Sequence, residues 1–102
     1  MTKGYWIAHV DITDPEGYKR YQAANAEPFA HYGAKFLSRA NDNEVVEGSF
    51  RSRHVIIEFP SYEAAQACYH SEAYQYAKSL RADAGVADLI IVEGYDGPQP
   101  GV

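Results

Sequence analysis

The sequence predicts an α+β fold in which strands and helices follow the order β-α-β-β-α-β. Four runs rich in β-branched and aromatic residues are separated by turn signals, which indicates four strands. Two of the intervals between these runs carry apolar residues at helical spacing. The chain has 102 residues, of which 46% are hydrophobic, and this suits one packed core without room for a second.

The first strand is expected over residues 4–12, and the turn-prone segment 13–15 ends it. Asp14 is expected to cap the helix that follows, with Pro15 in its first position. This helix is expected to present one mostly aromatic stripe to the core. The stripe contains Tyr18, Tyr21, Asn25, Pro28, Phe29 and Tyr32.

The end of the first helix carries two signals. Pro28 is expected to kink or split the helix after Ala26, because proline lacks the N–H that continues the hydrogen-bond ladder. Gly33 is expected to end it. Residues 34–40 then form the second predicted strand, and residues 41–43 the turn that follows it.

The middle of the chain contains the third predicted strand. Residues 44–48 are expected to form a short extended piece, and residues 53–59 form the strand itself, which Pro60 ends. Ser61 is expected to cap the second helical region, with Glu63 in its first turn.

The last part of the chain is expected to hold a second break and the fourth strand. Ser71 is expected to cap a further helix that runs to Gly85, and residues 87–95 form the last strand. The domain is expected to cover residues 1–96. Residues 97–102 are rich in glycine and proline and are expected to form a flexible tail.

This element order is the split βαβ pattern of the ferredoxin-like fold, an antiparallel sheet with helices on one face. In the third and fourth strands, residues on both alternate sets are apolar: Ile56 alternates with Val55 and Ile57, and Leu89 and Ile91 alternate with their neighbours. Helices cover only one face of such a sheet. We therefore expect a second copy of the chain to cover the other face, giving a homodimer.

Charge and cysteine content exclude several classes of protein. The net charge is −5, which disfavours nucleic acid and anionic membrane surfaces as partners. Cys68 is the only cysteine, so no internal disulfide and no cysteine-rich metal site is expected. The sequence shows no signal peptide and no membrane-spanning run, and a cytoplasmic location is the expectation.

The chain resembles domain-of-unknown-function family 1330 in four segments, which are residues 4–18, 32–39, 57–62 and 69–75. The most specific segment is the last, with the sequence YHSEAYQ, and Arg81 follows it. The resemblance extends from Gly4 to about Tyr95. It departs from the family at Cys68, where the family often has tryptophan. The resemblance implies a dimeric α/β barrel, similar in architecture to antibiotic-biosynthesis monooxygenases, and it implies no established activity.

Six residues are candidates for a ligand site: His9, Arg39, Glu47, Ser71, Tyr74 and Arg81. His9 would act as an acid/base group or donor in a cavity, or else as a histidine satisfied by one hydrogen bond. Arg39, Glu47 and Arg81 would meet at one end of the sheet as an anion clamp, or else form a structural ion-pair network. Ser71 and Tyr74 would add hydroxyls, or else serve as a helix cap and as packing.

The sequence leaves three functions open. The first is a homodimer that binds a small aromatic or carboxylate-bearing molecule in a cavity of each subunit. The second is cofactor-independent oxygenation or isomerisation, by analogy with similar barrels. The third is a structural or interaction role without a pocket. The histidines lack metal-binding spacing and there is no nucleotide-binding motif, so neither a metal nor a cofactor is expected.

Overall fold

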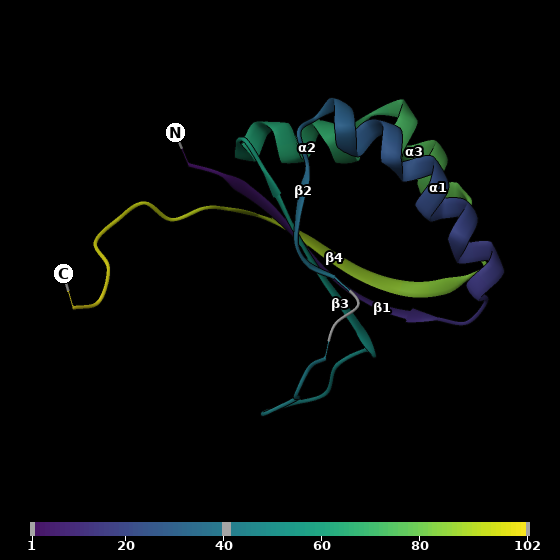
Figure 1. The fold of residues 1–102 in the computed structure, drawn as a ribbon, viewed down its shortest axis with the longest axis horizontal. Helices are drawn as coiled ribbons and strands as arrows, with labels where there is room; N and C mark the ends of the chain where they lie inside the picture. The colour runs from purple at the N-terminus through teal and green to yellow at the C-terminus, as the bar shows by residue number, and fades with distance from the viewer. Residues whose placement is uncertain (1, 40–41, 102) are drawn as a thin grey trace.

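The computed structural model of the chain describes residues 2–39 and 42–101. Its elements are β1 (Gly4–Ile12), α1 (Pro15–His31), β2 (Lys35–Arg39), β3 (Arg53–Phe59), α2 (Tyr62–His70), α3 (Glu72–Ser79) and β4 (Gly85–Glu93). These strands form one antiparallel sheet in the order β2-β3-β1-β4. Figure 1 shows the helices together on one face of the sheet. The ferredoxin-like α+β fold predicted from the sequence is confirmed.

The two capping serines act as the sequence predicts. The Ser61 hydroxyl accepts a hydrogen bond from the Ala64 backbone N–H at 3.0 Å, and the Ser71 hydroxyl accepts one from the Tyr74 N–H at 3.1 Å. Each bond satisfies a backbone donor that the first turn of a helix leaves unpaired. Asp14 occupies the N-cap position of α1, but its side chain makes no capping bond.

Two predicted helix boundaries are wrong. The prediction that Pro28 splits the first helix fails, because α1 runs through it to His31. Pro28 is fully buried, and we attribute the continuity to this packing, which offsets the missing hydrogen bond. The last helix ends at Ser79 instead of Gly85. Gly85 already pairs with Ile12 in the sheet, where a side chain would collide with the carbonyl oxygen of Asp11.

The segment between β2 and β3 also differs from the prediction. The expected extended piece at 44–48 takes no part in the sheet. β2 ends at Arg39, and the predicted strand end at Ala40 and turn start at Asn41 lie outside the described residues. The domain boundary at residue 96 stays a prediction. None of the helices in 2–39 and 42–101 has the length and apolarity that crossing a membrane requires.

The core lies between the helices and the sheet face that they cover. Trp6 of β1 is at its centre and is 1% exposed. Its ring contacts those of Phe29, Phe59, Tyr69 and Tyr74 at centroid distances of 4.9 to 5.8 Å. The Trp6 indole N–H donates a hydrogen bond to the Ala65 carbonyl at 2.9 Å, so its one polar atom is satisfied inside the core.

The strand register assigns the alternate residues to the two faces. Val55 and Ile57 belong to the core under the helices, whereas Ile56 is 36% exposed and Ile90 is 57% exposed. Ile56 is paired with Ile7 and Ile7 with Ile90, so these three form a row across the uncovered face. We call this the isoleucine row, and we call the uncovered side of the sheet the open face. Because no helix in the described part of the chain covers the open face, the isoleucine row makes the middle of that face an exposed apolar surface.

Candidate functional site

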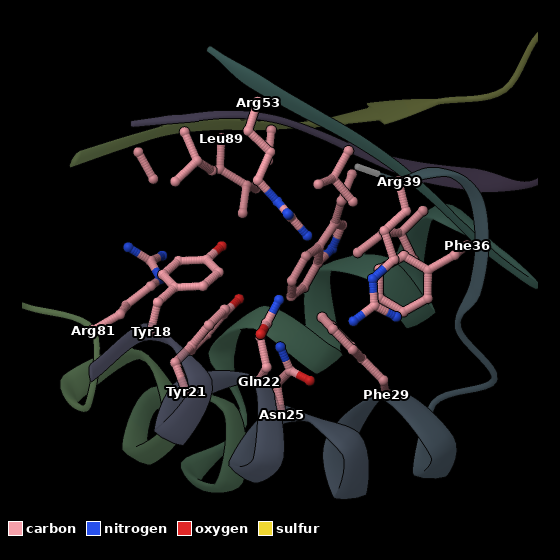
Figure 2. Close-up of a pocket in the computed structure, with 16 residues that line it drawn as sticks. Tyr18, Tyr21, Gln22, Asn25, Phe29, Phe36, Arg39, Arg53, Arg81 and Leu89 are labelled. Carbon is pink, nitrogen blue, oxygen red and sulfur yellow. The ribbon is translucent and has the colours of Figure 1, made fainter. Parts of the chain in front are cut away.

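A cavity lies between α1 and the covered face of the sheet, and Figure 2 shows the side chains that converge on it. The space in it that the centre of a water-sized molecule can occupy is about 40 Å³. The lining residues are Trp6, Ala8, Val10, Tyr18, Tyr21, Gln22, Asn25, Phe29, Phe36, Arg39, Arg53, Val55, Ile57, Arg81, Ala87 and Leu89. The wall is mostly aromatic and aliphatic, with a few polar groups, as is usual for a small-molecule site.

The sequence pattern explains why these side chains meet. Tyr18, Tyr21, Asn25 and Phe29 follow one another at steps of three and four residues, so they lie along one side of α1. On β1, β3 and β4, the lining residues are those of one alternate set, which points to the same face of the sheet. On β2, a register shift between Phe36 and Ser38 lets both Phe36 and Arg39 line the cavity. The aromatic stripe predicted on the first helix therefore forms one wall of the cavity.

Three guanidinium groups reach the cavity from three separate elements. Arg39 ends β2, Arg53 begins β3, and Arg81 lies in the turn after α3. Each guanidinium carbon lies over an aromatic ring, at a distance suited to a cation–π contact. The distances to the ring centres are 4.4 Å from Arg39 to Phe36, 5.9 Å from Arg53 to Tyr18 and 5.1 Å from Arg81 to Tyr21.

None of these three arginines forms an ion pair with a carboxylate in the part of the chain that the structure describes. The ion pairs found there join Lys19 to Glu16 and Arg51 to Asp11 and Asp88. The Nε atom of Arg53 is buried and has no hydrogen-bond partner. A buried donor without a partner destabilises a protein, so the fold carries a cost at this atom to hold Arg53 in place.

A pair of tyrosine hydroxyls lies beside Arg81. The Tyr21 and Tyr74 oxygens are 2.8 Å apart, and Nη2 of Arg81 donates to the Tyr74 oxygen at 3.5 Å. Burial is the main cause that raises the pKa of Tyr74, and the neighbouring Tyr21 adds to it. Burial alone would lower the pKa of Arg81, but the hydrogen bond to Tyr74 and the charge interactions with both tyrosines outweigh it and raise this pKa. The arginine thus stays charged and the tyrosine stays protonated.

Tyr18 lies within the field of all three arginines. Burial, followed by Tyr21, raises the pKa of its hydroxyl, while the charges of Arg53, Arg81 and Arg39 oppose that rise. The Tyr18 hydroxyl consequently remains protonated at neutral pH. Together these groups present hydrogen-bond donors and positive charge toward the same space, which is the chemistry that binds an anion.

The structure brings together only part of the predicted site. Arg39 and Arg81 line the cavity, and Tyr74 is buried behind its wall in contact with both Tyr21 and Arg81. Ser71 is not among the lining residues. Its hydroxyl caps α3 and also donates to the Cys68 carbonyl at 2.7 Å.

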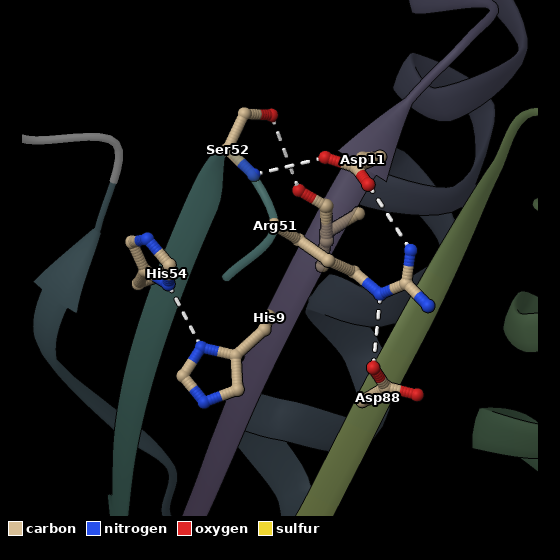
Figure 3. Close-up of polar contacts among 7 residues, drawn as sticks. His9, Asp11, Arg51, Ser52, His54 and Asp88 are labelled. Atoms are coloured by element: carbon tan, nitrogen blue, oxygen red, sulfur yellow. Dashed lines mark hydrogen bonds and ion pairs between the residues drawn. The ribbon is translucent and has the colours of Figure 1, made fainter. Parts of the chain in front are cut away.

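His9 and Glu47 lie away from the cavity. Figure 3 shows His9 on the open face, where its Nδ1 is 2.8 Å from Nδ1 of His54 on the paired strand. Glu47 lines a separate hollow with these two histidines, so it does not join Arg39 and Arg81 as the sequence analysis expected. Sequence alternation alone could not place His9, because both faces of β1 carry large side chains.

Arg53, Tyr18 and Tyr21 line the cavity but were not among the six candidates. The sequence did indicate the position of Arg53. It belongs to the same alternate set of β3 as Val55 and Ile57, so its side chain is expected to point to the core face of the sheet. Such a residue must be paired with something, which makes it a stronger site marker than an exposed charge.

Replacing Ser71 with alanine is expected to lower the free energy of unfolding by about 1 kcal/mol, because α3 loses its cap. Urea denaturation followed by circular dichroism measures this change. Because Ser71 is not a lining residue, affinity for any cavity ligand should stay the same. A tenfold loss of ligand affinity without loss of stability would instead assign the hydroxyl to the site.

Comparison with known proteins adds the following findings. The sequence matches the family described as "Domain of unknown function (DUF1330)" over residues 3–95. The fold resembles that of a protein of unknown function from Rhodopseudomonas palustris, with a TM-score of 0.71, 18% identity, and coverage of 94% of this chain and 85% of that one. None of the curated proteins matches the sequence.

Two further solved structures are similar. One is SnoaB, a cofactor-independent oxygenase from Streptomyces nogalater, with a TM-score of 0.63, 11% identity, and coverage of 99% of this chain and 98% of that one. The other is a dimeric protein of unknown function with a ferredoxin-like fold from Bacteroides fragilis, with a TM-score of 0.51, 11% identity, and coverage of 89% and 95%. At these identities the likeness shows a common fold.

Proposed function

The chain belongs to the family described as a domain of unknown function, DUF1330, and we propose that its cavity binds a small aromatic molecule that carries a carboxylate. The observation that carries this proposal is the set of three arginines without a carboxylate partner among the described residues. A protein with a net charge of −5 has many carboxylates to offer, and none of those described is directed at this cavity.

The class of ligand follows from the two kinds of side chain that line the cavity, the arginines and the aromatic residues. A guanidinium group offers a planar fork of donors that matches a carboxylate, and three such groups line the cavity. The rings of Trp6, Phe29 and Tyr18 supply flat apolar surface beside these donors. An aliphatic acid would satisfy only the arginines, whereas a neutral aromatic molecule would leave them unpaired.

The proposal is tested with a thermal-shift panel of benzoate, 2-naphthoate, their neutral amides and hexanoate. A ligand that binds only the native state raises the melting temperature, so the aromatic acids are expected to raise it and the amides are not. Arg53→Met should weaken binding of the aromatic acids about tenfold, because it removes one charge-assisted hydrogen bond. Arg20→Met is the matched control, since Arg20 is exposed on α1 and the charge change is the same.

If the amides raised the melting temperature as much as the aromatic acids do, that result would contradict the proposal. So would an Arg53→Met variant that binds benzoate as well as the Arg20→Met control does. Isothermal titration calorimetry of both variants makes this comparison quantitative.

The homodimer expected from the sequence is part of the same proposal. The isoleucine row makes the middle of the open face apolar, the exposed Val86 adds apolar surface near the start of β4, and the exposed Phe50 lies beside His9 at the rim. The similar protein from Bacteroides fragilis is described as dimeric. A second copy on the open face would leave the cavity free, because the cavity lies on the helix side of the sheet.

Cofactor-independent oxygenation is the second candidate function, and the resemblance to SnoaB supports it. That candidate depended on an acid/base pair in the cavity, with His9 as the preferred base. The described lining residues include no histidine and no carboxylate, so tyrosines and arginines would have to do this chemistry. Oxygen uptake by the protein with a bound phenolic acid would favour this candidate over binding alone.

A further inference from the structure

The positive groups of the cavity lie at separate places along it. Figure 2 shows Arg81 beside Tyr18 and Tyr21 at one end and Arg39 beside Phe36 at the other, with Arg53 reaching in from the sheet between them. Arg39 and Arg53 come from neighbouring strands, where Arg39 is paired with Val55, two residues beyond Arg53. Arg81 comes from a different part of the chain, the turn between α3 and β4.

Each end of the cavity has its own set of donors. At one end, Arg81 and the linked hydroxyls of Tyr21 and Tyr74 form a hydrogen-bonded cluster. At the other end, Arg39 provides a second set of donors, and Arg53 lies between the two ends. A single carboxylate placed against one set leaves the other set without an anion.

Aromatic surface separates the two sets of donors. The rings of Tyr18 and Tyr21 have centroids 5.2 Å apart, with Arg53 over the first ring and Arg81 over the second. The wall beyond them continues through Trp6 and Phe29, whose centroids are 5.3 Å apart. A flat ring system fits between two polar ends better than a flexible chain, because it loses less conformational freedom on binding.

We propose that the ligand is a flat aromatic molecule with an acidic group at each end, one held by Arg81 with Tyr21 and the other by Arg39, with Arg53 between them. This inference rests on the proposed function and goes beyond it by naming a two-ended ligand. The Tyr21 hydroxyl and Arg81 donate to the first acidic group, and Tyr74 supports the Tyr21 hydroxyl from behind. The guanidinium group of Arg39 pairs with the second acidic group.

Calorimetric titration of two matched pairs of acids tests the proposal. Benzoate is compared with benzene-1,4-dicarboxylate, and 2-naphthoate with naphthalene-2,6-dicarboxylate, which differ in the separation of their carboxylates. At least one dicarboxylate is expected to bind ten times more tightly than its monoacid. Arg81→Met should remove that advantage, whereas Arg20→Met, a change of the same charge at an exposed position, should retain it.

The outcomes separate this inference from the proposed function. If the monoacids bind and neither dicarboxylate binds more tightly, the two-ended ligand is wrong and the binding function stands. If no aromatic acid binds, both are wrong. Should Arg81→Met fail to fold, the comparison in the unmodified protein decides the matter, and Arg81→Lys tests the position while keeping its charge.

Discussion

Replacing Trp6 with alanine is expected to lower the free energy of unfolding by about 4 kcal/mol, within the 3–5 kcal/mol range of large aromatic truncations. The side chain is 1% exposed and contacts four aromatic rings, so the substitution opens a void that its neighbours cannot fill. It also leaves the Ala65 carbonyl without the indole donor. For a domain of this size we expect a fall in melting temperature of at least about 12 °C.

Urea denaturation followed by far-ultraviolet circular dichroism measures the effect of Trp6→Ala, because the variant loses its tryptophan fluorescence. Trp6→Phe is the control, since it keeps an aromatic ring and removes the N–H. We expect its cost to be less than half that of Trp6→Ala. A loss below 1 kcal/mol for the alanine variant would show that Trp6 is not the centre of the core.

Replacing Ile90 with lysine is expected to convert the proposed dimer into monomers. Ile90 lies at the β4 end of the isoleucine row, and a lysine there would put an unpaired charge into an apolar interface twice, once from each copy. We expect the dissociation constant of the dimer to rise at least about 100-fold, which corresponds to about 2.7 kcal/mol. Sedimentation velocity across a concentration series measures this change.

The control for Ile90→Lys is Tyr76→Lys. Tyr76 is a large exposed side chain like Ile90, but it lies on α3, on the helix side of the molecule. This variant is expected to sediment like the unmodified protein. A dimer that survives both Ile90→Lys and Ile56→Lys would place the interface somewhere other than the open face, and a monomeric unmodified protein would end the dimer proposal.

The fold was predictable because its signals are local and mutually consistent. Period-two apolar runs gave the strands, and Ser61 and Ser71 marked helix starts through bonds that span only three residues. The failures lie where tertiary contacts override local preference. Pro28 is tolerated inside α1 through burial, and α3 ends early because Gly85 is needed in the sheet against Asp11.

The candidate site was less predictable than the fold, since it depends on which face each side chain occupies. Arg39 and Arg81 were found as cations near element ends. His9 was assigned to the cavity although it lies on the open face beside His54, because β1 is apolar on both faces and its pattern does not distinguish them. Arg53 shares the alternate set of Val55 and Ile57, but a charged side chain is usually exposed, so the residue type conceals its inward position.

The three arginines of the cavity also have a consequence for the protein without its ligand. Like charges brought near one another repel, and the field of all three acts on the hydroxyl of Tyr18. An occupant that neutralises them relieves this repulsion as well as making contacts of its own. If the cavity binds an anion as proposed, chloride, phosphate and sulfate from the solution would compete for the same space, and the choice of buffer would change the affinity that a titration measures.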